Sequence, residues 1–413
     1  MQWANFLHIY QPAEQQSDIL EAIVTQSYRP LLQGLKRHKR VRLTLNVNGA
    51  LLELFDRDRH HDLIDILRQL GREGRIEFTS SAKYHAFLPY LEQGEIVRQV
   101  VANNEANTFY LGDAYRPKGF FPPEMAYSEK LAPIVEELGF DWLILDEIAC
   151  GGDGARAVDY TKGYRIAGTK VRVFFRERRL SNLIMSAVVR SGESLREAMP
   201  EDSGASRYVL TAMDGETFGH HRPGLVEMLF DILKAPEFEF ITISDIPRYY
   251  PEEREVVPVT STWASSHEDI RKGIQFLSWS DPDNPIHAWQ WDFTALVLDE
   301  VHAMDPRHPA YEPVRKKMDV ALSSDHFFWA SAKPWWSVEM IEVGAFRLLE
   351  TLRSMPGVTP EKLEKARNFY EHIISTAFNW QRSGKIRSMM REQKTILRVP
   401  FKERTLGQGG GER

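Results

Sequence analysis

Short apolar segments alternate with longer helical patterns through the first 235 or so residues of the chain. In the helical stretches the apolar residues recur every three to four positions, which is typical of an amphipathic helix. Seven segments are predicted as strands, within residues 3–12, 41–49, 75–91, 117–127, 140–147, 170–178 and 206–216. Alternation of strands with helices indicates a parallel sheet. The pattern therefore predicts an α/β fold, a closed or nearly closed barrel of seven strands.

The pattern changes after residues 247–258, a charged, proline-containing stretch that we interpret as a domain boundary. From about residue 266 onward the apolar spacing is helical. We expect a barrel domain over residues 1–258, a helical C-terminal domain over 259–402, and a disordered tail over 403–413, which contains "TLGQGGGER".

Composition excludes several classes of protein. A net charge of −6 over 413 residues gives no basic surface for nucleic acid or an anionic membrane. No apolar run reaches the ~18 residues needed to span a bilayer, and no signal peptide is evident at the start of the sequence. The single cysteine, Cys150, excludes an internal disulfide and favours a reducing compartment. We expect a cytoplasmic protein, and its oligomeric state stays open.

Polar and ionisable residues follow nearly every predicted strand, at the end that carries the active site in barrels of this kind. No glycine-rich dinucleotide or phosphate loop occurs among these turns, so no such cofactor is expected. Glu124 follows two prolines, which stiffen the backbone and would suit a positioned nucleophile or base. It could equally be an acidic residue before the next helix, stabilised by the helix dipole.

The segment "YVLTAMDGETFGHHRPG" places Asp214 and Glu216 two residues apart at the end of an apolar strand. Two close carboxylates raise the pKa of one of them, as a general acid requires. The alternative is a solvated Asp-Gly turn, although His220, His221 and Arg222 follow at once and could position a polar ligand.

His8 and His85 lie near the ends of two other predicted strands. A lone histidine beside a strand is most often a hydrogen-bonded core residue, but these two with Asp214 could form a metal site or bind hydroxyl groups. A zinc motif of the H-E-x-x-H kind is absent. The later segment is rich in tryptophan, within "TSTWASSHEDI", "SSDHFFWA" and "KPWWS". Most of these rings will be core, and some could stack on sugar rings.

These motifs together resemble glycoside hydrolase family 57, whose members act on α-glucans with retention of configuration. The resembling segments are, in the order of the family's five motifs, "FLHIYQP", "GRIEFTSSAKYHAFLPYL", "GFFPPEMAYSEKLAPIVEELGFDWLILDE", "LTAMDGETFGHHRPG" and "SSDHFFWAS". The first has tyrosine where many members have histidine, and "FFPPE" lacks the tryptophan common before the nucleophile.

The resemblance implies an incomplete (β/α)7 barrel followed by a helical C-terminal part. It implies a retaining hydrolase or transglycosylase of the α-amylase or glucanotransferase type, with Glu124 as nucleophile and Asp214 as acid/base. Its partner would be an α-glucan or oligosaccharide, and no cofactor or metal is expected. The expected substrate-binding residues are His8, Gln11, His85, Glu216, His220, Trp263, Asp325 and Trp329.

Two alternatives stay open. One is a metal-dependent polysaccharide deacetylase-like enzyme with His8, His85 and Asp214 around a divalent cation that activates water. The other is a glucan-binding protein with little turnover, against which the paired Glu124 and Asp214 argue. Linkage preference, chain length and the balance of hydrolysis and transfer are not predicted.

Overall fold

The computed structural model describes residues 1–151, 157–199, 207–333 and 335–397. The described chain divides into two compact units, Met1–Gln275 and a second that begins at Phe276. The tail predicted over 403–413 lies outside the described residues. Among the described helices, none is both long and apolar enough to cross a bilayer.

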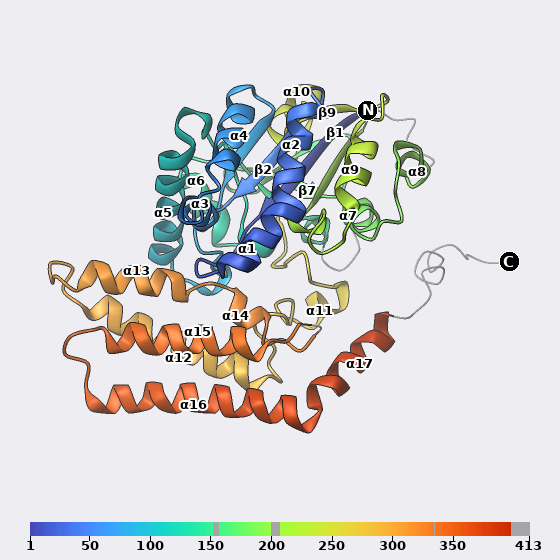
Figure 1. Ribbon diagram of the computed structural model, residues 1–413. Coiled ribbons are helices and arrows are strands. Elements are labelled where there is room, and N and C mark those ends of the chain that lie inside the picture. Colours follow the sequence, from blue (N-terminus) through green and yellow to red (C-terminus); the bar gives the residue numbers. More distant parts are fainter. Residues whose placement is uncertain (152–156, 200–206, 334, 398–413) are drawn as a thin grey trace. The chain divides into compact units, whose positions relative to one another are not determined.

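The first unit is built around one sheet, whose central strands are parallel (Figure 1). Their order across the sheet is β7, β5, β4, β3, β2, β1, β8. The bounds are β1 (Gln2–Ile9), β2 (Leu43–Val47), β3 (Ile76–Ser80), β4 (Gly119–Phe120), β5 (Trp142–Asp146), β7 (Arg172–Arg176) and β8 (Tyr208–Asp214).

The two outer strands of this order, β7 and β8, come together without forming a regular ladder. The backbone N–H of Glu177, just after β7, donates to Leu210 O at 2.7 Å, and Ser181 Oγ accepts from Ala212 N at 3.1 Å. The sheet therefore curls into an incomplete (β/α)7 barrel, as predicted.

Three further strands of three or four residues extend the sheet and were not predicted. β9 (Glu239–Ile241) pairs with the first residues of β1. β6 (Gly163–Ile166) runs antiparallel to β7, and β10 (Glu253–Val256) pairs with β6.

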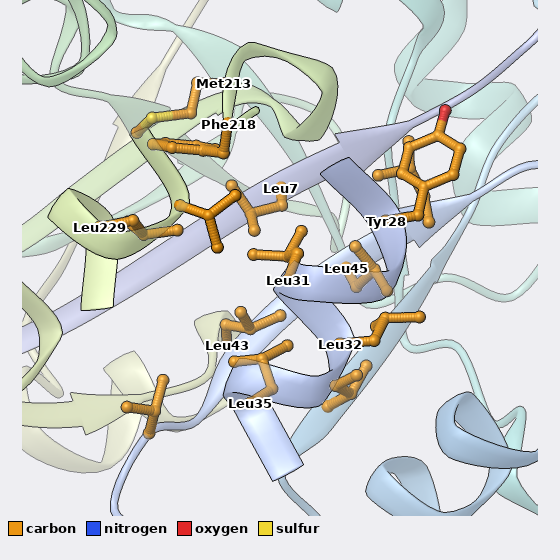
Figure 2. Close-up of a cluster of buried hydrophobic side chains, with 14 of the residues drawn as sticks. Leu7, Tyr28, Leu31, Leu32, Leu35, Leu43, Leu45, Met213, Phe218 and Leu229 are labelled. Carbon is orange, nitrogen blue, oxygen red and sulfur yellow. The ribbon is translucent and has the colours of Figure 1, made fainter. Parts of the chain in front are cut away.

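Helices of the first unit pack their apolar faces against the sheet. In Figure 2, Leu31, Leu32 and Leu35 of one helix pack against Leu7 of β1 and Leu45 of β2. Burial of side chains of this kind is the main stabilising contribution to such a layer. The helices are α1 (Ser17–Ile23), α2 (Arg29–Arg37), α3 (Gly49–Arg57), α4 (His61–Arg72), α5 (Gln93–Leu111), α6 (Leu131–Glu137), α7 (Arg178–Met185), α8 (Gly192–Glu197), α9 (Leu225–Leu233), α10 (Ile246–Tyr249) and α11 (His267–Arg271).

The second unit is helical, as the apolar spacing predicted. α12 (Pro285–Ala303), α15 (Val338–Arg353) and α16 (Pro360–Ser383) run side by side (Figure 1). The longest, α16, starts with a Thr359 side-chain cap and a first-turn proline, and ends at Gly384 with left-handed backbone. The other helices are α13 (Tyr311–Ala321), α14 (Asp325–Phe328) and α17 (Lys385–Leu397).

The division between the units falls later than the boundary predicted at residue 258. Residues just beyond 258 are tied to the barrel by backbone hydrogen bonds: Val259 N donates to Ala149 O at 2.9 Å, and Ser261 pairs with Tyr127. A change in sequence pattern does not reveal such pairing.

Candidate active site

The carboxyl ends of β1, β2 and β8 bring three polar side chains together. The strand register sets His8 beside Asp214 on one side and beside Asn46 on the other. His8 Nδ1 lies 2.8 Å from Asn46 Oδ1, and a ring nitrogen that donates there leaves Nε2 as an acceptor. Burial, then the neighbouring His85, lowers the pKa of His8, so this ring is neutral.

Glu124 stands on a strained turn directly after β4. The short 3-10 segment Pro123–Met125 contains left-handed backbone at two consecutive non-glycine residues, with φ of 62° at Glu124 and 48° at Met125. Residues with side chains rarely adopt this conformation, and such strain concentrates at functional sites. The preceding Pro122 and Pro123, noted in the sequence, hold the segment that carries it.

Two rings flank the Glu124 carboxyl group. Trp263 Nε1 donates to Glu124 Oε2 at 2.7 Å, and the Trp263 backbone N–H donates to Glu124 O at 3.2 Å. On the other side, His85 Nδ1 lies 3.8 Å from Oε1. Burial lowers the pKa of His85 to about 3, so a neutral imidazole faces this oxygen. One carboxylate oxygen is thus held by an indole.

His85 also has left-handed backbone, at φ 57°, and its ring belongs to a stack. It lies against Tyr10 with centroids 4.5 Å apart and against His8 at 5.1 Å. The turn that presents it is held from α5, where Gln99 accepts from Tyr84 N at 3.2 Å through its side chain. The first two predicted strand-end histidines are therefore in direct contact.

The Asp214 carboxyl group carries a raised pKa of about 6. Burial is the main cause, and the positive charge of Arg176 opposes it. A carboxyl group that keeps its proton to about this pH can act as a general acid near neutrality.

Glu216 lies two residues after Asp214, and its buried carboxyl group accepts hydrogen bonds from other residues of the chain. Tyr28 Oη donates to its Oε1, Tyr10 N donates to the same oxygen at 3.0 Å, and Gln11 Nε2 approaches it at 3.5 Å. Burial, followed by the charge of Asp214, raises the pKa of Glu216 to about 7.

Tyr28 ends a π-helical segment (Val24–Tyr28) between α1 and α2, where a continuous helix was predicted. Such π-turns are frequent at functional sites.

The remaining predicted residues are His220, between β8 and α9, and Asp325 and Trp329. His220 Nδ1 lies 2.9 Å from Gln26 Oε1. Asp325 and Trp329 belong to the second unit, where Asp325 accepts from the Ser323 hydroxyl and Trp329 meets Trp335 edge to face at 5.6 Å.

Sequence reasoning missed Arg176, whose charge acts on Asp214, and Tyr28, which donates to Glu216. Arg176, at the end of β7, pairs with Asp146 at the end of β5. A charged residue that closes the apolar run "VRVFFR" was the available signal. Tyr28 gave no signal, because it lies in the middle of a helical pattern.

Within the part of the chain that the structure describes, no group of three or more His, Cys, Asp and Glu side chains is arranged to hold a metal ion. The alternative set of His8, His85 and Asp214 is not such a group. Ring nitrogens bind a metal in the plane of the ring, and the two imidazoles are stacked with planes 18° apart, so their lone pairs do not converge.

Comparison with known proteins gives a consistent result. The sequence matches the family described as "Glycosyl hydrolase family 57" over residues 7–258. It is 25% identical to an alpha-amylase of Pyrococcus horikoshii over 232 residues, which cover 54% of this chain and 35% of that protein. It is 24% identical to a 4-alpha-glucanotransferase of Thermococcus kodakarensis over 237 residues, covering 56% and 35%. The chain thus matches about a third of the length of these relatives.

A solved structure with a similar fold is a family 57 branching enzyme, TK1436 of Thermococcus kodakaraensis. The TM-score is 0.70 at 16% identity, over 89% of this chain and 94% of that one. This likeness agrees with the barrel and the helical unit described above.

Proposed function

Because the chain belongs to glycosyl hydrolase family 57, we propose that it is a retaining glycoside hydrolase or transglycosylase that acts on α-glucans. Glu124 is the nucleophile and Asp214 the acid/base. The observation that carries this proposal is the difference between the two carboxyl groups: the indole of Trp263 donates to Glu124, whereas burial keeps a proton on Asp214 up to about pH 6. A double displacement needs a positioned nucleophile and an acid that still carries its proton.

In the first step, Glu124 attacks the anomeric carbon through one carboxylate oxygen while the indole N–H holds the other. A glycosyl ester forms, and the bond from the anomeric carbon to the leaving oxygen breaks. Asp214 gives its proton to that oxygen as it departs. The neutral His85 near Glu124 adds no positive charge that would stabilise the carboxylate and weaken its attack.

In the second step, Asp214 is the base. It takes a proton from water or from a sugar hydroxyl, whose oxygen bonds to the anomeric carbon as the bond from that carbon to Glu124 breaks. Water gives hydrolysis, and a sugar hydroxyl gives transfer. Both carboxyl groups return to their starting protonation states.

The substrate contacts are proposed from the same arrangement. His8 and His85 are neutral imidazoles that offer donors and acceptors to sugar hydroxyls. Gln11 and Glu216 share one hydrogen-bonded cluster with Tyr28. Trp263 and His220 complete the proposed binding residues of the first unit, and Asp325 and Trp329 of the second unit are proposed from the family resemblance alone.

The test is to incubate the protein with maltooligosaccharides of defined length, a branched glucan and an aryl α-glycoside, and to separate the products by chromatography. The wild type should convert at least one α-glucan. Glu124→Ala should lose turnover of every substrate, and azide should restore some activity with an inverted azide product.

Asp214→Ala is the matched variant for the second acid. It should keep the first step on an aryl substrate with a good leaving group, and azide should give a product of retained configuration. The same azide stereochemistry from both variants would refute the assignment. Oligosaccharide binding by the wild type with no product after long incubation would favour the glucan-binding alternative.

A further inference from the structure

Arg176 is a buried cation at the carboxyl end of β7, 4% exposed. Its Nη2 donates to Asn182 Oδ1 at 3.0 Å, and its Nε lies 3.4 Å from Asp146 Oδ2. Burying a guanidinium group is costly unless nearby charges and acceptors compensate. The fold accepts this cost at a strand end that faces the candidate site.

The guanidinium group of Arg176 lies over the indole of Trp263, 5.6 Å from its ring. This is the indole whose N–H donates to Glu124. A cation over the face of an indole is attracted by the ring quadrupole, and the attraction is larger when both are desolvated. Arg176 therefore restrains the ring that holds one oxygen of Glu124.

A second arginine fixes the backbone of the same loop. Arg178 donates to Trp263 O at 3.1 Å and to Ser265 O at 2.8 Å, and its Nε donates to Asp146 Oδ1 at 2.9 Å. Asp146 thus binds Arg178 and lies against Arg176. With the loop backbone held by Arg178, the indole face is presented to Arg176 in one position.

Arg176 is also close to the strand that carries Asp214. The next residue, Glu177, donates its backbone N–H to Leu210 O on β8 at 2.7 Å. The charge of Arg176 lowers the pKa of Asp214, and burial of Asp214 raises it. Arg176 thus acts on Asp214 through its charge and on Glu124 through its contact with Trp263.

We propose that Arg176 is a positioning residue that couples the two acids: it places a buried positive charge beside the strand that carries Asp214, and its planar guanidinium group holds Trp263 against Glu124. The roles given to the acids rest on the proposed function, whereas the charge effect on Asp214 does not. The ionisable groups around Arg176 and Asp214 on the surrounding elements are Asp146 at the end of β5, Glu147 after it, Glu177 and Arg178 after β7, Glu216 after β8, Tyr28, His8, and Glu124 beyond Trp263.

The consequence is chemical. Without the cation, Asp214 would hold its proton to higher pH and become a weaker acid toward the leaving oxygen and a stronger base toward water. Without the planar face, the indole would be less restrained and its hydrogen bond to Glu124 less often formed. The first effect depends on charge and the second on shape, so different substitutions separate them.

The experiment measures the titration of Asp214 directly in the full chain, labelled with [γ-¹³C]aspartate, by NMR. Asp214→Asn assigns the signal. In Arg176→Gln the midpoint should move to higher pH by about one pH unit, the low end of what a nearby opposite charge produces. Arg176→Lys keeps the charge and should leave the midpoint near the wild-type value. Arg172→Gln, which removes a charge from the same strand at a more exposed position paired with Glu253, is the matched control and should not move it.

The same variants report on Trp263. Arg176→Lys should lower kcat on a maltooligosaccharide more than it changes KM, because the planar face is lost while the charge stays. An unchanged Asp214 midpoint in a folded Arg176→Gln protein would overturn the charge effect, and wild-type kcat in Arg176→Lys would overturn the role toward Trp263. Since the NMR titration needs no substrate, its result stands even if no α-glucan is converted.

Discussion

Two acidic side chains at the end of β8, Asp214 and Glu216, have raised pKa values, and each has different neighbours. The positive charge of Arg176 lowers the pKa of Asp214 against the effect of burial, whereas Glu216 accepts hydrogen bonds from Tyr28 and Tyr10. If Asp214 is the general acid, kcat/KM for a maltooligosaccharide should fall as pH rises through about 6, because the required proton is lost. An aryl glycoside with a good leaving group should show a much weaker fall. A profile for the maltooligosaccharide that stays flat well above that pH would contradict this role.

Glu216 should make folding itself depend on pH. Its pKa rises from an ordinary 4.5 to about 7 in the folded chain, so the fold favours the protonated form. Its contribution to stability is complete below the ordinary pKa and is lost as pH rises through about 7. The shift corresponds to roughly 3 kcal/mol.

Glu216→Gln removes this dependence, since the amide stays neutral and can still accept from Tyr28. The free energy of unfolding is measured with urea at about pH 4 and about pH 8. Relative to the wild type, that of the variant should be higher at pH 8 than at pH 4 by roughly 3 kcal/mol. Glu364→Gln, at an exposed position on α16, is the control and should show no such gain. An equal difference between Glu216→Gln and the wild type at both pH values would mean that Glu216 is not held protonated.

The turn Pro123–Met125 is the element that presents Glu124, and its left-handed backbone should be visible in stability. Glycine adopts this conformation without the clash of a Cβ atom. Glu124→Gly should therefore be more stable than Glu124→Ala by about 1 kcal/mol. At Glu364, in the interior of α16, the order should reverse by a similar amount, because alanine favours a helix. Thermal or urea unfolding of the four variants checks both signs. Equal stability of the Glu124 pair would show that the turn is not strained in solution.

The elements most open to prediction were those with a strong local pattern. Strands such as β5 and β8 are continuous apolar runs, and α16 has a cap, a helical period and a terminating glycine. The two-residue β4 was recognisable mainly through Glu124 and the prolines around it. β6, β9 and β10 escaped notice because they owe their existence to pairing with residues far away in the sequence. No pattern in "SSAKYH" indicates the left-handed backbone of His85.

The residues of the candidate site also differ in how far the sequence predicts them. Ionisable residues at strand ends, such as His8, Asp214 and Glu124, follow from the alternation of the pattern together with the family resemblance. Their partners do not. Arg176 contacts Trp263 from 87 positions away in the numbering, and Tyr28 reaches Glu216 across 188 positions. Such contacts depend on how the sheet curls, which a single sequence does not state.

The first unit has the properties of an independently folding body. Two buried apolar clusters, one on the helix-covered face of the sheet and one that includes Phe6, Trp142 and Phe174, draw all their buried members from within residues 1–250. A unit with its own core can fold alone. Residues 259–275 add no member to either buried cluster, yet they carry Trp263, which packs as a partly buried ring against the second cluster.

Two truncated chains distinguish the boundary predicted at 258 from the division observed after Gln275. Both fragments, 1–258 and 1–275, should show the circular dichroism of an α/β protein. The longer one keeps the pairing of Ser261 with Tyr127 and the Trp263 hydrogen bonds to Glu124. Partial burial of one indole and a few buried hydrogen bonds contribute on the order of 3 kcal/mol. The fragment 1–275 should therefore unfold at clearly higher urea concentration than 1–258, and Trp263→Ala in 1–275 should remove part of the difference. Equal midpoints for the two fragments would mean that residues 259–275 are a linker and that the earlier boundary is correct.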